Sequence, residues 1–168
     1  MRFESLSQAG QDKFAYERIG NSGTFLDIGC GDQNGSNTLA LERLGWTGLL
    51  VDINPKAVAW CKQNRKSPII AKDATAIDWE IPCIEHAVDY LSLDIDDKKG
   101  EPSKIVRTLQ HLLDVGFMFR VMTIEHDRYR IGDETRNQVR AICAAQGYKL
   151  AVGDVAHKGN EFEDWWVR

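Results

Sequence analysis

A short glycine-rich segment flanked by acids is the part of the sequence best suited to bind a ligand. It covers residues 27–32 (DIGCGD) and follows apolar residues that predict a buried strand. Glycines let the backbone turn tightly and approach a ligand closely. Ligands in open α/β sheets bind beyond the carboxyl ends of the strands. We therefore expect Gly29, Gly31 and the backbone N–H of Cys30 to line a binding site.

A second acid, Asp52, ends the next predicted strand. About 20 residues beyond such a glycine loop, an acid accepts hydrogen bonds from ribose hydroxyls in nucleotide-binding sites. The alternative is that Asp52 only caps the helix that begins near Pro55. Asn54 is already a good N-cap before Pro55, which leaves Asp52 free for a diol. We therefore expect Asp52 and the adjacent Ile53 to contact a nucleoside.

The charges around the loop indicate which nucleotide binds. A dinucleotide fingerprint has a third glycine beside the pyrophosphate, but Asn34 stands at that position and Gly35 follows it. Asp27 and Asp32 would repel a pyrophosphate, whereas they would attract an ammonium group and a positive sulfonium. This charge pattern favours S-adenosylmethionine over NAD as the cofactor.

Asp73 and Ala74 follow the short third strand that the sequence predicts. An acid at this place can accept a hydrogen bond from an adenine amino group, and the N–H of Ala74 can meet a ring nitrogen. By position alone, a solvated loop aspartate is about as good an interpretation of Asp73.

Four polar residues at two neighbouring strand ends are candidates for the reacting side of the site. Asp94 and Asp96 end one predicted strand, and Glu125 and His126 end the next. Either His126 or Asp94 acts as a general base on a hydroxyl acceptor, or Asp94, Asp96 and Glu125, with or without His126, hold a divalent cation such as Mg²⁺. The third interpretation is that His126 caps a strand end and that the acids are solvated.

These residues need a sheet to position them, and the apolar pattern predicts one. Short apolar runs alternate with amphipathic stretches, which indicates βαβ units and a mostly parallel sheet. Two strands follow the last helix and should form a hairpin that adds one antiparallel strand. The expected strands cover residues 24–29, 49–53, 68–71, 88–95, 117–125, 148–155 and 163–168, and the expected helices cover residues 9–19, 36–44, 55–65, 102–113 and 134–146. We expect one domain over residues 1–168, with the short helix 9–19 preceding a seven-stranded, Rossmann-like class I methyltransferase sheet that has helices on both faces.

Composition narrows the class of protein. The 168 residues carry a net charge of −4 and contain neither a membrane-spanning apolar run nor a signal peptide. We expect a cytoplasmic protein with no membrane partner. The absence of a basic stripe argues weakly against a nucleic-acid substrate. Cys30, Cys61, Cys83 and Cys143 form no CxxC pair, so buried free thiols are expected.

Four segments together resemble the FkbM-type methyltransferase family. They are SQAGQDKF, FLDIGCGDQNGSNTLALERLGWTGLLVDINPKAV, VDYLSLDIDD and TIEHD, and the resemblance extends from Ser7 to Trp166. It implies a class I methyltransferase domain that uses S-adenosylmethionine for O-methylation of small molecules or sugars. Carried over by position, it implies that Asp94 lies near the transferred methyl and that six residues face the cofactor: Gln11, Asp27, Gly29, Gly31, Asp52 and Asp73.

Two departures separate the sequence from this family. The family commonly has Asp-x-Glu-Gly where this chain has Asp94-Ile95-Asp96-Asp97, and the chain has little insertion to form a lid. These departures keep a second function open, that of a cofactor-binding partner domain without catalysis. An NAD-linked oxidoreductase is a third interpretation.

Overall fold

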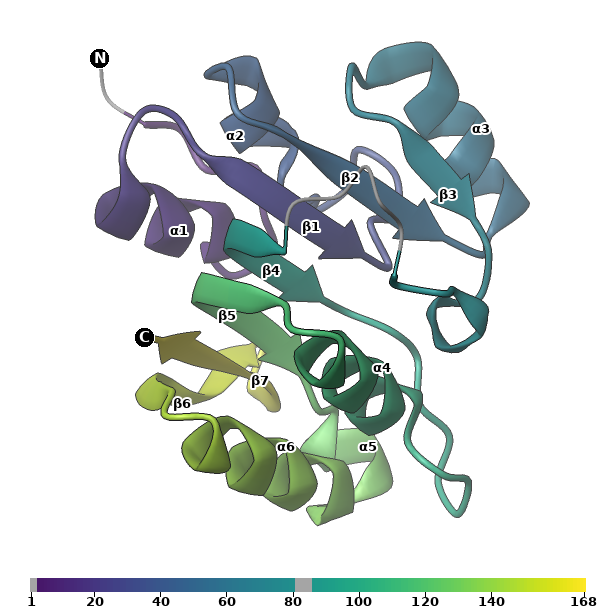
Figure 1. Ribbon diagram of the computed structural model, residues 1–168, viewed down its shortest axis with the longest axis vertical. Coiled ribbons are helices and arrows are strands. Elements are labelled where there is room, and N and C mark those ends of the chain that lie inside the picture. Colours follow the sequence, from purple (N-terminus) through teal and green to yellow (C-terminus); the bar gives the residue numbers. More distant parts are fainter. Residues whose placement is uncertain (1–2, 81–85) are drawn as a thin grey trace.

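A seven-stranded sheet forms the centre of the computed structural model, which describes residues 3–80 and 86–168. The strands are β1 (Thr24–Ile28), β2 (Thr47–Asp52), β3 (Ile69–Ala71), β4 (Ala87–Leu93), β5 (Met118–Glu125), β6 (Lys149–His157) and β7 (Asn160–Val167). They lie in the order β3-β2-β1-β4-β5-β7-β6 (Figure 1). The first five are parallel, and β7 runs antiparallel to both β5 and β6. The predicted fold class, including its single antiparallel strand, is confirmed.

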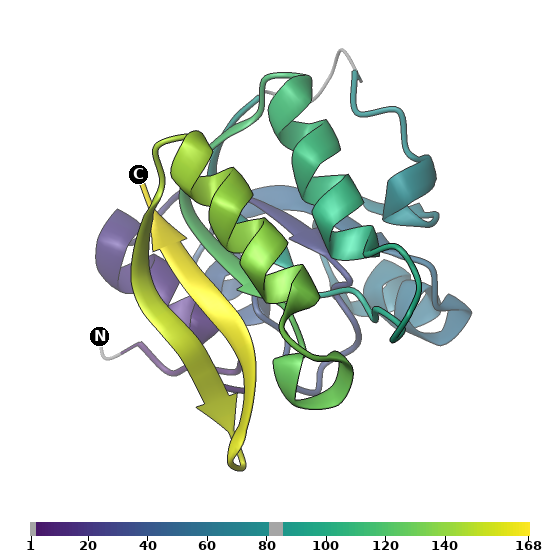
Figure 2. The same ribbon diagram turned by 90° about the horizontal axis from the view of Figure 1, so that it is seen from below.

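Helices cover both faces of the sheet. They are α1 (Gln11–Ile19), α2 (Leu39–Arg43), α3 (Pro55–Asn64), α4 (Lys104–Asp114), α5 (Arg128–Ile131) and α6 (Glu134–Ala145), with a 3₁₀ turn, η1, at Ala74–Ala76. In the view from below, α4 and α6 lie next to each other on one side of the sheet (Figure 2). None of the helices in the described ranges is both long enough and apolar enough to cross a membrane.

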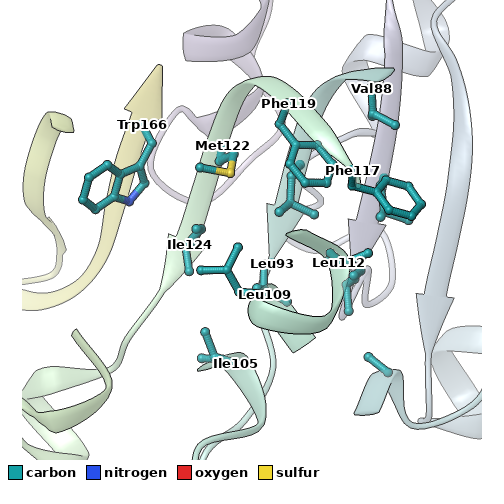
Figure 3. Close-up of a cluster of buried hydrophobic side chains, with 14 of the residues drawn as sticks. Val88, Leu93, Ile105, Leu109, Leu112, Phe117, Phe119, Met122, Ile124 and Trp166 are labelled. Atoms are coloured by element: carbon teal, nitrogen blue, oxygen red, sulfur yellow. The ribbon is translucent and has the colours of Figure 1, made fainter. Parts of the chain in front are cut away.

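The face covered by α4 and α6 carries the larger apolar core. Ile105, Leu109 and Leu112 recur at helical spacing along α4 and are fully buried. They pack against sheet side chains that include Leu93 and Met122 (Figure 3). Burial of this face therefore fixes α4 behind the carboxyl end of β4.

A second core lies between the sheet and the helices α1 to α3. Phe14 of α1, Leu41 of α2 and Cys61 of α3 pack there with Phe25 and Tyr90 of the sheet. Toward the carboxyl ends of the strands, this face becomes polar. Asp27, Ser92 and Thr123 lie side by side on β1, β4 and β5, and all three are buried.

Several predicted bounds need correction. The helix expected from Ala9 begins at Gln11, and the strands expected from Leu49 and Glu163 begin earlier, at Thr47 and Asn160. The helix expected from Ser36 begins at Leu39, with Thr38 at the N-cap position, and the Ser36 hydroxyl in the preceding turn accepts the Leu39 N–H at 3.2 Å. The helix expected from Pro102 begins at Lys104, because Ser103 caps it by accepting the Val106 N–H at 3.1 Å. The short helix α5 stands where a loop was expected after residue 127.

The cysteines match the expectation of free thiols where they can be placed. Cys30, Cys61 and Cys143 are buried free thiols that form no disulfide bond. Cys83 lies outside the described residues.

Candidate functional site

A cleft opens at the carboxyl ends of β1, β2 and β4, with a volume of about 530 Å³. Its walls come from the glycine loop after β1, the end of β2, the turn after β3 and the segment after β4. The cleft brings together nine of the residues that the sequence singled out: Gly29, Gly31, Asp32, Asp52, Ile53, Asp73, Ala74, Asp94 and Asp96.

The glycine loop has a backbone shape that requires glycine. Gly29 and Gly31 have φ angles of 79° and 59°, which side chains disfavour. A Cβ on Gly29 would also collide with the carbonyl oxygen of Asp94. The Asp94 N–H donates to the carbonyl of Ile28 at 2.9 Å, so β1 and the segment after β4 meet closely at this point.

The sequence suggested that Asp52 would be free of other partners. In the structure, its carboxylate instead accepts hydrogen bonds that hold this loop. One carboxylate oxygen accepts the Gly31 N–H at 2.9 Å, and the other accepts the Asn54 N–H at 2.7 Å. Asn54 still caps α3 as expected, by accepting the Lys56 N–H. A carboxylate has about four acceptor positions, so Asp52 keeps capacity for a diol in the cleft. Ile53 beside it is 65% exposed and offers an apolar surface.

Asp73 makes more contacts within the protein than the sequence led us to expect. Its carboxylate accepts the N–H and hydroxyl of Thr75 and pairs with the Lys104 ammonium at 2.9 Å. The hydrogen bond from Lys104 is the main reason that the pKa of Asp73 falls to about 2. Lys104 also lines the cleft, and sequence reasoning missed it because it lies on a distant helix. Ala74 is buried beside Asp73 in the cleft wall.

A smaller polar recess of about 100 Å³ lies on the other side of the glycine loop. Gln11, Asp27, Cys30, Asn37 and Asp94 are among the residues that line it. Asp94 and the two loop glycines border both the recess and the cleft, which are therefore neighbours.

Among the described residues of the recess, one buried acceptor, the Asn37 carbonyl oxygen, lacks a donor. The Asn37 amide donates to Ser92 at 3.0 Å, but its buried carbonyl oxygen has no partner among the described residues. Asp27 is buried and accepts the Thr38 hydroxyl. Burial raises the pKa of Asp27, against the effects of Thr38 and the Arg65 charge. No pattern in the sequence identified Asn37.

Asp94 and Glu125 form a carboxyl pair at the ends of β4 and β5. Burial raises the pKa of Asp94 to about 6, against the effect of its hydrogen bond with Glu125. Burial and the Asp94 charge raise the pKa of Glu125. Since two close carboxylates repel each other, such a pair holds one proton between them.

A buried acid lies on the strand next to this half-buried pair. Glu163 of β7 is opposite Glu125, and burial raises its pKa to about 8. It accepts the indole N–H of Trp165 at 2.7 Å. Sequence reasoning missed Glu163, because only the hairpin pairing places it beside the pair.

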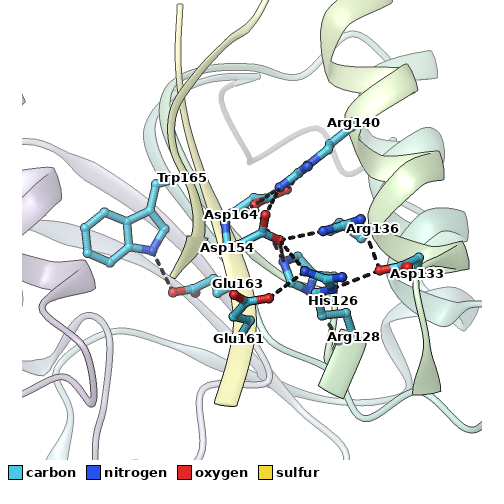
Figure 4. A network of polar contacts seen from close by, with 10 residues as sticks. All are labelled: His126, Arg128, Asp133, Arg136, Arg140, Asp154, Glu161, Glu163, Asp164 and Trp165. Carbon is cyan, nitrogen blue, oxygen red and sulfur yellow. Dashed lines mark hydrogen bonds and ion pairs between the residues drawn. The ribbon is translucent and has the colours of Figure 1, made fainter. Parts of the chain in front are cut away.

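His126 does not reach the cleft. It is fully buried, and its Nδ1 accepts the Arg128 N–H at 3.3 Å, while its Nε2 lies 3.6 Å from Asp164. Figure 4 shows it inside an ionic network that joins α5 and α6 to the terminal hairpin. The geometry therefore gives His126 a packing role and leaves Asp94 and Glu125 as the candidate acid–base groups.

The acids proposed as metal ligands are not assembled as a site. The Asp96 side chain is 93% exposed and pairs with Arg130 at 3.2 Å, whereas Asp94 is half-buried and is hydrogen-bonded to Glu125. Within residues 3–80 and 86–168, the one group with ligand spacing is His126, Asp154 and Asp164. Arginines already neutralise that group, with Arg136 at 2.8 Å from Asp154 and Arg140 at 2.7 Å from Asp164. The residues present therefore do not fit a divalent cation.

Comparison with known proteins agrees with this architecture. Residues 26–98 match the family model described as a methyltransferase domain. No curated protein matches the sequence. The structure resembles magnesium protoporphyrin IX methyltransferase from Synechocystis PCC 6803, solved with bound SAM, at 18% identity and a TM-score of 0.64 over 96% of this chain and 79% of that one.

Two further solved structures are similar at the level of the fold. A TehB-like SAM-dependent methyltransferase from Corynebacterium glutamicum has 15% identity and a TM-score of 0.63 over 95% of this chain and 87% of that one. An rRNA methylase from Streptococcus thermophilus has 14% identity and a TM-score of 0.59 over 94% and 93%. The chain thus has the Rossmann-like fold of class I methyltransferases.

Proposed function

We propose that this chain is an S-adenosylmethionine-dependent methyltransferase, with a small-molecule or sugar hydroxyl as the acceptor. The carrying observation is the polar recess beside the cleft. Two of its groups, the unpartnered Asn37 carbonyl and the buried Asp27 carboxyl, suit a cationic hydrogen-bond donor. In the neighbouring cleft, Asp52 stands where it could accept hydrogen bonds from a diol. A nucleoside that carries an ammonium group matches both the recess and the cleft.

The residues present fit this cofactor. Asn37 and Asp27 would hold the ammonium, Asp52 the ribose hydroxyls, and Ile53 with Ala74 the adenine. Asp32 is exposed at the rim, where its charge favours a cation over a phosphate. When bound, S-adenosylmethionine supplies an electrophilic methyl on a positive sulfur.

The carboxyl pair gives the site a proton acceptor. Asp94 borders both the cleft and the recess, which supports a role for it beside the reacting centre in this binding mode. The ionised member of the Asp94–Glu125 pair would accept the proton that an acceptor hydroxyl loses when it takes the methyl and S-adenosylhomocysteine leaves. Alignment of the acceptor supplies most of the remaining rate enhancement.

The acceptor class rests on the FkbM-type resemblance and on the net charge. The rRNA methylase from Streptococcus thermophilus shares the fold, so an RNA acceptor belongs in the same assay. The short chain and exposed Asp96 also suit the alternative of a cofactor-binding domain without catalysis.

Calorimetric titration with S-adenosylhomocysteine tests the cofactor, with NADH as the competing ligand. We expect saturable binding of S-adenosylhomocysteine and none of NADH. No binding at millimolar concentration would remove the proposal. Transfer of a labelled methyl to hydroxyl compounds, sugars or RNA then separates an enzyme from a binding domain, since the domain would bind without turnover.

A further inference from the structure

Two buried thiols lie against each other directly under the glycine loop. The Sγ atoms of Cys30 and Cys61 are 3.8 Å apart, and both side chains are at least 96% buried. Cys30 belongs to the loop, whereas Cys61 lies on α3 and packs in the core. The Cys61 thiol also reaches the Gly31 carbonyl at 3.4 Å, so the pair contacts the loop at two places.

Oxidation would require only a small approach of the two sulfur atoms. A disulfide bond is about 2.05 Å long, so the gap must close by about 1.8 Å. The loop, rather than the helix that carries Cys61, would move, at the expense of the hydrogen bond that the Cys30 N–H donates to the Val51 carbonyl at 3.3 Å. The helical Cys61 is the fixed partner.

We propose that Cys30 and Cys61 form a reversible intrachain disulfide with hydrogen peroxide as oxidant, and that this modification closes the cofactor site. This inference rests on the proposed cofactor function. Cys30 lines the recess of about 100 Å³, which admits a molecule of the size of peroxide and excludes a glutathione disulfide. Bound cofactor would fill the recess and protect the pair.

The reaction balances in two steps. The Cys30 thiolate attacks one peroxide oxygen, the O–O bond breaks, and a sulfenic acid and hydroxide form, the latter leaving as water with the thiol proton. The Cys61 sulfur then attacks the sulfenic sulfur, and a second water leaves as the S–S bond forms. Two thiols are oxidised by two electrons, and one peroxide is reduced to two waters.

Burial sets the rate at which the pair reacts. Burial raises the pKa of both thiols, which keeps the thiolate scarce. Oxidation should therefore be slow at neutral pH, faster in alkali, and fastest in the cofactor-free protein.

The disulfide would distort the loop that Asp52 holds. Pulling Cys30 toward α3 displaces Gly31, whose N–H donates to Asp52 at 2.9 Å. The recess and the diol position both depend on this short segment. Oxidised protein should consequently bind S-adenosylhomocysteine at least 10-fold more weakly, and a dithiol reductant should restore binding.

The experiment uses the full chain with Cys83→Ser, which removes the thiol outside the described residues. Peroxide-treated protein, with and without S-adenosylhomocysteine, is digested and analysed by mass spectrometry for a Cys30–Cys61 cross-linked peptide. Titration with S-adenosylhomocysteine follows before and after reduction. Cys61→Ser should form no cross-link, and Cys143→Ser should behave as the parent, because Cys143 lies in the other core.

Each outcome decides the inference. A cross-link that forms in free protein, is suppressed by S-adenosylhomocysteine and weakens its binding supports the proposal. Absence of the Cys30–Cys61 peptide after prolonged alkaline peroxide treatment overturns it, as does a complete cross-link with unchanged affinity. If the reduced protein binds no S-adenosylhomocysteine, the proposed function fails, while the cross-link measurement still decides whether the disulfide forms.

Discussion

The carboxylate of Asp52 accepts the backbone N–H of Gly31 at 2.9 Å, so the acid that ends β2 holds the loop that ends β1. The same carboxylate accepts the Asn54 N–H and faces the cleft. One side chain thus joins the two strand ends that would bind a nucleoside.

Replacing Asp52 should weaken cofactor binding more than it weakens the fold. Asp52→Ala removes a charged acceptor, and hydrogen bonds to charged groups contribute roughly 1.5–3 kcal/mol each. We expect at least a 10-fold loss of S-adenosylhomocysteine affinity by calorimetry, and a smaller loss for Asp52→Asn, which keeps one acceptor oxygen. Asp114→Ala, an exposed acid at the far end of α4, is the control. Equal affinity of Asp52→Ala and the parent would remove Asp52 from the site.

The two loop glycines should respond differently to a methyl group. Both have positive φ, but a Cβ meets the Asp94 carbonyl at Gly29 and nothing within 4 Å at Gly31. Gly31→Ala should cost about 1–2 kcal/mol of unfolding free energy from conformation alone. Gly29→Ala should cost clearly more, because β1 and the segment after β4 must separate. Denaturant unfolding measures both, and similar losses would contradict this close approach.

Glu163 should make the fold less stable as pH rises. Its folded pKa is about 8 against an ordinary value of 4.5, so the folded state binds the extra proton between these values. The contribution of Glu163 to stability is therefore fully present below about pH 4.5 and is lost as pH rises to about 8. Glu163→Gln mimics the neutral acid and should remove this slope, with a gain on the order of a few kcal/mol at pH 7. Glu101→Gln, an exposed control, should keep the slope of the parent.

Asp94 should make binding of the positive cofactor depend on pH. Its pKa is about 6, so it gains negative charge as pH rises through that value. S-adenosylmethionine carries one positive charge more than S-adenosylhomocysteine. The affinity for S-adenosylmethionine relative to S-adenosylhomocysteine should therefore rise between pH 5 and pH 7.5. We expect a rise of about several-fold, which is the effect of one additional nearby charge. Asp94→Asn should flatten the ratio, and a flat ratio in the parent would contradict this placement of Asp94.

Arg140 should be required for the fold and not for the cleft. It donates two hydrogen bonds to Asp164, which is fully buried. Although burial acts to raise the pKa of Asp164, the hydrogen bonds from Arg140 and the nearby His126 ring hold this pKa well below its usual value. Removing one partner of a buried ion pair costs about 3–5 kcal/mol. Arg140→Ala should lose this much at pH 7, as measured by denaturant unfolding.

Acid provides a second check on this ion pair. A depressed folded pKa contributes stability above the ordinary value of 3.8, and this contribution is lost as pH falls below it. The difference between the parent and Arg140→Ala should therefore shrink in strong acid. Arg107→Ala on the exposed face of α4 is the control. A loss below 1 kcal/mol in Arg140→Ala would show that the network is unimportant for folding.

Local sequence patterns predicted the architecture of the fold and the residues of the site that lie at strand ends. The alternation of apolar runs and amphipathic stretches predicted the parallel sheet, and the strand pair after α6 predicted its antiparallel member, because side-chain periodicity is a property of neighbouring residues. Gly29, Gly31 and Asp52 could be placed at the cleft for the same reason, since each lies at or next to a strand end.

Contacts between distant segments decided the rest. Lys104 reaches Asp73, and the hairpin sets Glu163 opposite Glu125. Asn37 donates to Ser92, and its carbonyl oxygen has no partner in residues 3–80 and 86–168. His126 follows Glu125 directly, yet the sheet turns it into the core and away from the cleft. A sequence gives the spacing along the chain, but only packing of the layers determines which side of the sheet a strand-end side chain faces and which partners it meets.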